Sequence, residues 1–375
     1  AFIGRWVGGD ALAGLGIVFP PMFIIMGITF GLGSGATTVI AQSIGQENKQ
    51  KADNAAEHII MLGIVLSLFF ILIGIYLGNT IISSQSSDPN VFLNASDYFY
   101  TMLWGTPFMI LSIFFRSILS GEGDNMMPMK VLGLGTLINL ILDPFFIYYF
   151  AIKGAALATV LSQATVFIIF IYLIIIKDKN YISLDLSNFK FNSRILSDIL
   201  KMGIPASLSM LIMSIGLFFY NMILSNTEFS SSAIAAYSTC HRIEHLFFIP
   251  IISLATSMVT LIGMFYGAKK NHLLNNLIYF SLKVSISISI IYAVFFLAFS
   301  ENILSLFTND NKIINIGVGY FNVFAFAIPF ISIGMTCSRA MQGLGKAYPM
   351  FIITCLRVIV ISCSLGYYFI NILNK

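Results

Sequence analysis

The sequence predicts an all-α polytopic membrane protein, and three observations support this fold class. Hydrophobic residues make up 58% of the 375-residue chain and charged residues only 10%, whereas a soluble domain carries about a quarter charged residues. Apolar runs repeatedly reach the ~20 residues that cross a bilayer. The basic residues sort by the loops between these runs. We predict ten spans, at 11–42, 59–83, 98–119, 128–150, 154–176, 202–226, 233–265, 274–299, 313–338 and 349–372.

Two of these spans and one polar stretch define the organisation of the chain. The spans 11–42 and 233–265 exceed one membrane crossing, so we expect their helices to extend beyond the lipid or to tilt. Between the halves lies 177–201, the longest polar stretch of the sequence. We expect this stretch to link an N-terminal lobe, 1–176, to a C-terminal lobe, 202–375.

The distribution of basic residues predicts the orientation in the membrane. If the loops alternate sides, the side that holds the linker carries about three times as many basic residues as the other, which makes it cytoplasmic by the positive-inside rule. Its residues are Lys49, Lys51, Lys130, Lys177, Lys179, Lys190, Arg194, Lys201, Lys269, Lys270 and Lys346, with Arg116 and Arg339 close by. The other side carries Arg5, Lys153, Lys312 and Lys375. The formal net charge of +4 is thus not gathered in one patch, and we expect no nucleic-acid partner.

The four cysteines predict neither disulfides nor a metal site. Cys240, Cys337, Cys355 and Cys363 lie in or beside apolar runs, without a C-x-x-C pair. We interpret them as small packing residues.

An internal repeat relates the two halves of the chain. Gly45 and Gly267 are 222 residues apart (267 − 45 = 222). The same separation links Pro107 with Pro329, Gly121 with Gly343, Gly123 with Gly345, Thr38 with Thr260 and Ala13 with Ala235. Four glycine or proline coincidences at one separation are unlikely to arise by chance, so we predict a structural repeat.

The number of intervening spans predicts how the halves are oriented. Six predicted spans separate Gly45 from Gly267, and an even number gives parallel repeats about an axis along the membrane normal. The span 202–226 has its counterpart before residue 5, and the span 154–176 has its counterpart beyond Lys375. We therefore expect an architecture of twelve spans, six in each lobe, of which ten are visible.

An acid lies inside the fourth predicted span. On a helix Thr136, Asn139 and Asp143 share one face, and Pro144 leaves the carbonyl of Leu140 without its helical partner. A charge at membrane depth is costly and usually faces a partner or a water-filled cavity. The alternative is a carboxyl near a helix end that reaches interfacial water. The cluster predicts an ion or proton site.

A second polar cluster lies in the seventh span. His241, Glu244 and His245 share a helix face, with Arg242 between them. The pattern matches the inverted zinc-protease motif, in which two histidines bind zinc and the glutamate activates water. No third zinc ligand can be assigned, and the motif lies in a predicted membrane span rather than in a catalytic domain. We favour a polar network of Glu244 with Arg242 or the histidines, facing a transport cavity or joining helices.

Several motifs together resemble the multidrug and toxic compound extrusion (MATE) family. The segment Gly33 to Gln42, followed by Gly45, resembles the second helix of these transporters. Further similar stretches are Arg116 to Gly123 with Pro128, Asn139 to Pro144, Gly154 to Thr159, Gly203 to Pro205 and Arg339 to Pro349. The resemblance covers essentially the whole chain and assigns Ala1 to Arg5 to the end of a first helix.

The resemblance implies a fold, an activity and a site. It implies two six-helix lobes in a bacterial plasma membrane that export cationic or amphipathic compounds in exchange for H⁺ or Na⁺. In the DinF-like branch the cation site lies in the N-terminal lobe, where Asn139, Asp143 and Thr159 match its residues. The partner acid of the first helix would precede Ala1. The NorM-like branch uses acids on the seventh and tenth helices, and none stands near Met213 or Ile331.

We therefore expect a MATE-type antiporter rather than an enzyme. Its partners would be small amphipathic or cationic substrates and the lipid bilayer, and the resemblance implies a monomer. It would need no cofactor beyond H⁺ or Na⁺ as coupling ion, with Na⁺ possible at Asp143 and Asn139. Two alternatives stay open: a lipid-linked saccharide flippase of the same superfamily, and a membrane-embedded zinc hydrolase that uses His241, Glu244 and His245.

Overall fold

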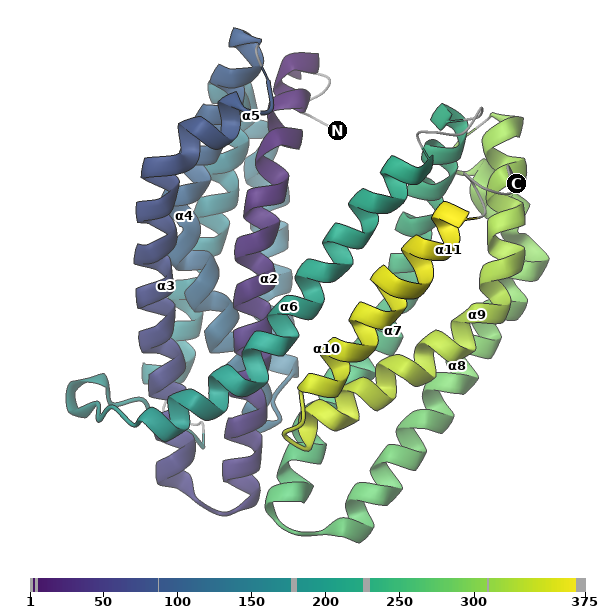
Figure 1. Ribbon diagram of the computed structural model, residues 1–375. Helices are drawn as coiled ribbons and strands as arrows, with labels where there is room; N and C mark the ends of the chain where they lie inside the picture. Colours follow the sequence, from purple (N-terminus) through teal and green to yellow (C-terminus); the bar gives the residue numbers. More distant parts are fainter. Residues whose placement is uncertain are drawn as a thin grey trace. The chain divides into compact units, whose positions relative to one another are not determined.

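The structure is a computed structural model that describes residue 3 and residues 6–86, 88–176, 181–224, 230–308 and 310–368. The described elements are all helical (Figure 1). The long helices are α2 (Gly9–Gly45), α3 (Lys49–Ser83), α4 (Pro89–Glu122), α5 (Met126–Ile171), α6 (Ser193–Leu224), α7 (Ser230–Gly267), α8 (Asn271–Ser305) and α9 (Asn311–Gly343). Shorter elements are η1 (Tyr172–Ile176), η2 (Leu186–Asn188), α10 (Tyr348–Cys355), η3 (Leu356–Cys363) and α11 (Ser364–Tyr367). Arg5, Lys177, Lys179, Lys375 and the end of the last predicted span lie outside the described residues.

In the described ranges, 8 helices are long and apolar enough to cross a membrane, and Tyr348–Cys363 is a shorter apolar helix. The helix α5 contains two predicted spans, 128–150 and 154–176, joined at Ala151, whose φ of 49° and ψ of −132° interrupt the helix. Gly154 lies so close to the backbone of Phe146 that a Cβ would collide with its carbonyl oxygen. The chain therefore turns back sharply just after the stretch that carries Asp143.

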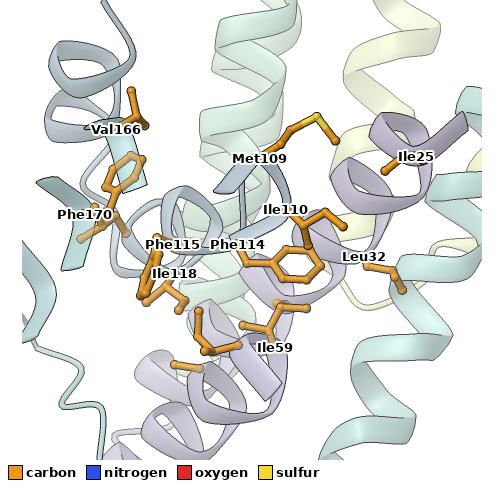
Figure 2. Close-up of a cluster of buried hydrophobic side chains, with 14 of the residues drawn as sticks. Ile25, Leu32, Ile59, Met109, Ile110, Phe114, Phe115, Ile118, Val166 and Phe170 are labelled. Carbon is orange, nitrogen blue, oxygen red and sulfur yellow. The ribbon is translucent and has the colours of Figure 1, made fainter. Parts of the chain in front are cut away.

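The chain divides into two compact units, Ala1–Ser207 and Leu208–Lys375, which we call the first and the second unit. The core of the first unit collects side chains from α2, α3, α4 and α5. Figure 2 shows Leu32, Ile59, Phe114 and Phe170 in this core, one from each of these helices. Each of these residues is at most 5% exposed, so the core is closed around α4, the helix at its centre.

Small residues bring the first half of α6 against α2. A Cβ at Gly35 would lie 2.6 Å from the Ile199 carbonyl oxygen, and one at Gly203 would lie 2.8 Å from the Leu32 Cα. The Ser207 hydroxyl donates to the Ile28 carbonyl at 2.9 Å. Close backbone approach through small residues is a common way to pack membrane helices. The start of α6 therefore belongs to the first unit.

The part of the linker that is described before α6, residues 181–192, is fastened to α3 and α4. The Ser183 amide donates to Asp53 at 3.0 Å, and the Asn192 amide donates to His58 Nε2 at 2.8 Å. Three further bonds join Lys49 to the Tyr181 carbonyl, Ile182 to Glu122, and Asn54 to the Lys190 carbonyl. The linker is therefore bound to the first unit along its described length.

The structure reproduces the repeat in its helix boundaries. The helices α3 and α8 begin at Lys49 and Asn271, and α5 and α10 begin at Met126 and Tyr348. Both pairs show the separation found in the sequence (271 − 49 = 222). The tight turns also correspond, because Glu47 and Lys269 both have a φ of 57°, and Gly123 and Gly345 both have positive φ. The two units thus share one chain trace from α2 to α5 and from α7 to α10.

Candidate functional site

The predicted ion site lies on the first half of α5. The Asn139 amide nitrogen donates to an Asp143 carboxylate oxygen at 3.3 Å, and both residues are half-buried. Thr136 is exposed, and its hydroxyl donates to the Leu132 carbonyl at 2.9 Å. The structure therefore brings the amide and the acid together, while the threonine hydroxyl bonds its own helix.

The helix α5 also supplies the residues after the break at Ala151. The Thr159 hydroxyl donates to the Ala155 carbonyl at 2.9 Å, within its own helix. One turn later lies Gln163, whose buried Oε1 atom has no hydrogen-bond partner among the described residues. Sequence reasoning missed Gln163, although its spacing of four residues places it on the same face as Thr159.

Tyr98 of α4 is a further neighbour of the acid. It is half-buried, and its hydroxyl lies within electrostatic range of Asp143. Sequence reasoning missed this residue as well, because Tyr98 and Asp143 are on different helices. The Tyr98 phenol therefore interacts electrostatically with the carboxylate of the Asn139–Asp143 pair.

The second polar cluster takes a different form from the predicted network. Glu244 is buried with 7% exposure, whereas Arg242 and His245 are exposed and His241 is half-buried. The hydrogen bond to the Glu244 carboxyl comes from the Tyr320 hydroxyl of α9. Within the described ranges, no three histidine, cysteine or acidic side chains are placed to hold a metal ion. The cluster therefore centres on a carboxyl and a phenol.

Comparison with known proteins identifies the family. Residues 1–145 and 205–368 match the family model MatE. This chain belongs to the MatE family. Asp143 lies in the first matched segment and Glu244 in the second. The match confirms the family predicted from the motifs of the sequence.

Curated relatives cover most of the chain. A probable multidrug resistance protein YoeA of Bacillus subtilis (strain 168) is 27% identical over 83% of this chain and 68% of its own length. A probable multidrug resistance protein NorM of Thermotoga maritima is 26% identical over 94% of this chain and 76% of its own. The multidrug export protein MepA of Staphylococcus aureus (strain MRSA252) is 26% identical over 96% and 79%.

Solved structures confirm the all-helical polytopic membrane fold. A multidrug resistance MATE family transporter of the MOP superfamily, in an outward-facing conformation, matches with a TM-score of 0.93 and 29% identity. The match covers 99% of this chain and 83% of that one. A MOP superfamily transporter from Pyrococcus furiosus, whose binding pocket of reverse polarity suggests a different function, has a TM-score of 0.91 and 29% identity. This match also covers 99% of this chain and 83% of that one.

Proposed function

We propose that this MatE protein is a secondary active antiporter that exports cationic or amphipathic compounds in exchange for H⁺ or Na⁺. It would lie in a bacterial plasma membrane as a monomer, with the linker in the cytoplasm, and alternate access through movement of one lobe against the other. The names of the curated relatives, multidrug resistance and multidrug export proteins, support the substrate class.

The observation that carries the proposal is the Asn139–Asp143 pair. The two side chains are 3.3 Å apart on a half-buried face of a helix that is long and apolar enough to cross a membrane. Ionisable side chains inside membrane spans are rare and mark ion pathways. Hard cations such as Na⁺ prefer oxygen ligands, which the Asp143 carboxylate and the Asn139 amide oxygen supply. A proton would bind the same carboxylate.

Three further groups of α5 are candidate ligands for the ion. Pro144 leaves the Leu140 carbonyl without a helical partner, and Gln163 offers an amide oxygen that has no partner among the described residues. Thr159 would need to release the Ala155 carbonyl before its hydroxyl turned toward an ion. Occupied and empty states of the site would therefore differ in the hydrogen bonds of α5.

A flippase for lipid-linked saccharides is less well supported. Such a substrate carries a pyrophosphate, which cationic side chains would have to bind. The Arg116 guanidinium lies 5.8 Å from the Phe30 ring centre, and Arg339 donates to Gln342 at 2.9 Å. Both arginines therefore have partners within their own units.

Transport in vesicles of purified protein tests the proposal. We expect dye export when an inward H⁺ gradient or an inward Na⁺ gradient is imposed, and separate trials identify the ion. Asp143→Asn should reduce gradient-driven export at least tenfold at equal protein content. Asp97→Asn is the matched control, since Asp97 is an exposed acid of the same unit. Undiminished export by Asp143→Asn would overturn the proposed site.

A further inference from the structure

Glu244 is a deeply buried acid that the proposed coupling site does not use. It lies on α7, is 7% exposed, and packs beside the core cluster formed by Cys240, Ile243 and Phe321. This cluster is otherwise apolar and rich in aromatic rings. A carboxylate in such surroundings loses its hydration. This loss is offset only when a nearby cation or several hydrogen bonds stabilise the charge, or when a proton neutralises it.

The hydrogen bonds of Glu244 do not satisfy an ionised group. The Tyr320 hydroxyl bonds to the carboxyl, but the buried Oε1 atom has no hydrogen-bond partner among the described residues. A charged oxygen left bare in a low-dielectric interior is far more costly than a neutral hydroxyl in the same place. The geometry therefore favours the protonated carboxyl.

Among the described residues, no cation forms an ion pair with this carboxyl. The titratable groups of α7 on its side are Tyr237, Cys240 and His241, and α9 contributes Tyr320. Arg242 is exposed, and within the described ranges no ion pair reaches Glu244. The helix α8 faces α7 with aromatic rings, since Phe296 contacts Phe247 with ring centres 4.8 Å apart.

The repeat supplies an independent argument. Tyr320, which bonds Glu244, is the repeat counterpart of Tyr98, which lies within electrostatic range of Asp143 (320 − 98 = 222). In each unit the tyrosine at this repeat position interacts with an acid, by a hydrogen bond in the second unit and at electrostatic range in the first. The acids themselves come from different helices, because the counterpart of Asp143 is Leu365 and that of Glu244 is Met22 (both again separated by 222).

We propose that Glu244, held by Tyr320, is a proton-binding site of the second unit, separate from the cation site at Asp143. In the conformation described here the carboxyl is neutral. The proton leaves to water when a movement of α7 against α9 brings water to Oε1. The site thus gives the second unit a proton-dependent state of its own. The proposal concerns proton binding and does not depend on whether Asp143 couples transport.

Infrared difference spectroscopy of purified protein in lipid tests the proposal directly. A protonated carboxyl has a carbonyl stretch that a carboxylate lacks. We expect the band in the wild-type protein at neutral pH, its loss in Glu244→Gln, and its persistence in Asp143→Asn. Glu301→Gln is the matched control, because Glu301 is an exposed acid of the same unit. A wild-type spectrum without the band, or a band unchanged in Glu244→Gln, would overturn the proposal.

A second variant tests the role of the tyrosine. Tyr320→Phe removes one hydroxyl and keeps the ring, which packs on Phe324 with ring centres 6.0 Å apart. We expect the band to remain but to shift to higher frequency, because a carboxyl that loses a hydrogen bond has a stiffer carbonyl. An unshifted band in a folded Tyr320→Phe protein would contradict the assigned hydrogen bond. Loss of the band would contradict the proposal, because a buried carboxyl that loses a hydrogen-bond donor holds its proton more tightly.

Discussion

The helix pair α3–α4 of the first unit and the pair α8–α9 of the second unit occupy equivalent places in the repeat but have different interiors. Gly63 of α3 packs on the ring of Phe114, where a Cβ would lie 2.8 Å from a ring carbon. Their counterparts are Ser285 and Thr336, whose hydroxyls are 2.9 Å apart. The repeat therefore fixes the backbone, while the chemistry between the helices is free to change.

The acids follow the same rule. In both units a carboxyl interacts with the repeated tyrosine. Asp143 is half-buried with an amide partner, whereas Glu244 is buried and its Oε1 has no partner among the described residues. A half-buried group exchanges ions with water more readily than a buried one. For the two proposed sites we therefore expect ion exchange to be faster at Asp143 than proton exchange at Glu244.

Replacing Phe114 of the first unit by threonine, the residue at the equivalent position of the second unit, should have the largest effect on stability. Phe114 is fully buried in the core shown in Figure 2. Phe114→Thr leaves a cavity and an unpaired hydroxyl, so we expect a loss of about 3–5 kcal/mol, as for large-to-small core substitutions. Thermal unfolding in detergent measures it. A melting temperature within error of wild type would show that the two interiors are interchangeable.

Equivalent glycines should respond alike. A Cβ at Gly121 would lie 2.7 Å from Ile40, and one at Gly343 would lie 2.8 Å from Ile262, the repeat counterpart of Ile40. We expect Gly121→Ala and Gly343→Ala each to lose about 1–3 kcal/mol through overpacking. Gly334→Ala is the control, because open space surrounds that position. A loss in only one of the two variants would break the structural equivalence of the units.

Removing one buried serine hydroxyl from each unit tests the difference between the two interiors in a smaller way. Ser285→Ala leaves Thr336 without its cross-helix partner, and we expect a loss of about 1 kcal/mol, the usual contribution of one hydrogen bond. In the first unit Ser67 bonds the Gly63 carbonyl of its own helix at 2.7 Å. Ser67→Ala should therefore cost less, since that carbonyl keeps its helical partner. Equal losses in chemical denaturation would contradict the distinction.

The sequence predicted the fold more completely than the site. The apolar runs and the repeated glycines and prolines depend on local composition, so the spans and the two similar halves were readable. Asn139 and Asp143 were found because they are four residues apart on one helix. Tyr98 and Tyr320 were missed, because their roles depend on acids on other helices. Their equal spacing in the repeat was visible, but it carried no meaning before the contacts were known.

The last difference between the units concerns the side chain of α3 that binds the linker. His58 accepts the Asn192 amide, and its counterpart in the second unit is Phe280, an exposed ring (280 − 58 = 222). His58→Phe removes the acceptor, and the ring can still pack on Phe189, 4.8 Å from it in the wild type. The effect should be local, because the other linker bonds remain. We expect faster hydrogen exchange at the Asn192 amide and little change in melting temperature, with Phe280→His as the control. Unchanged exchange at Asn192 would show that the fastening of the linker does not depend on His58.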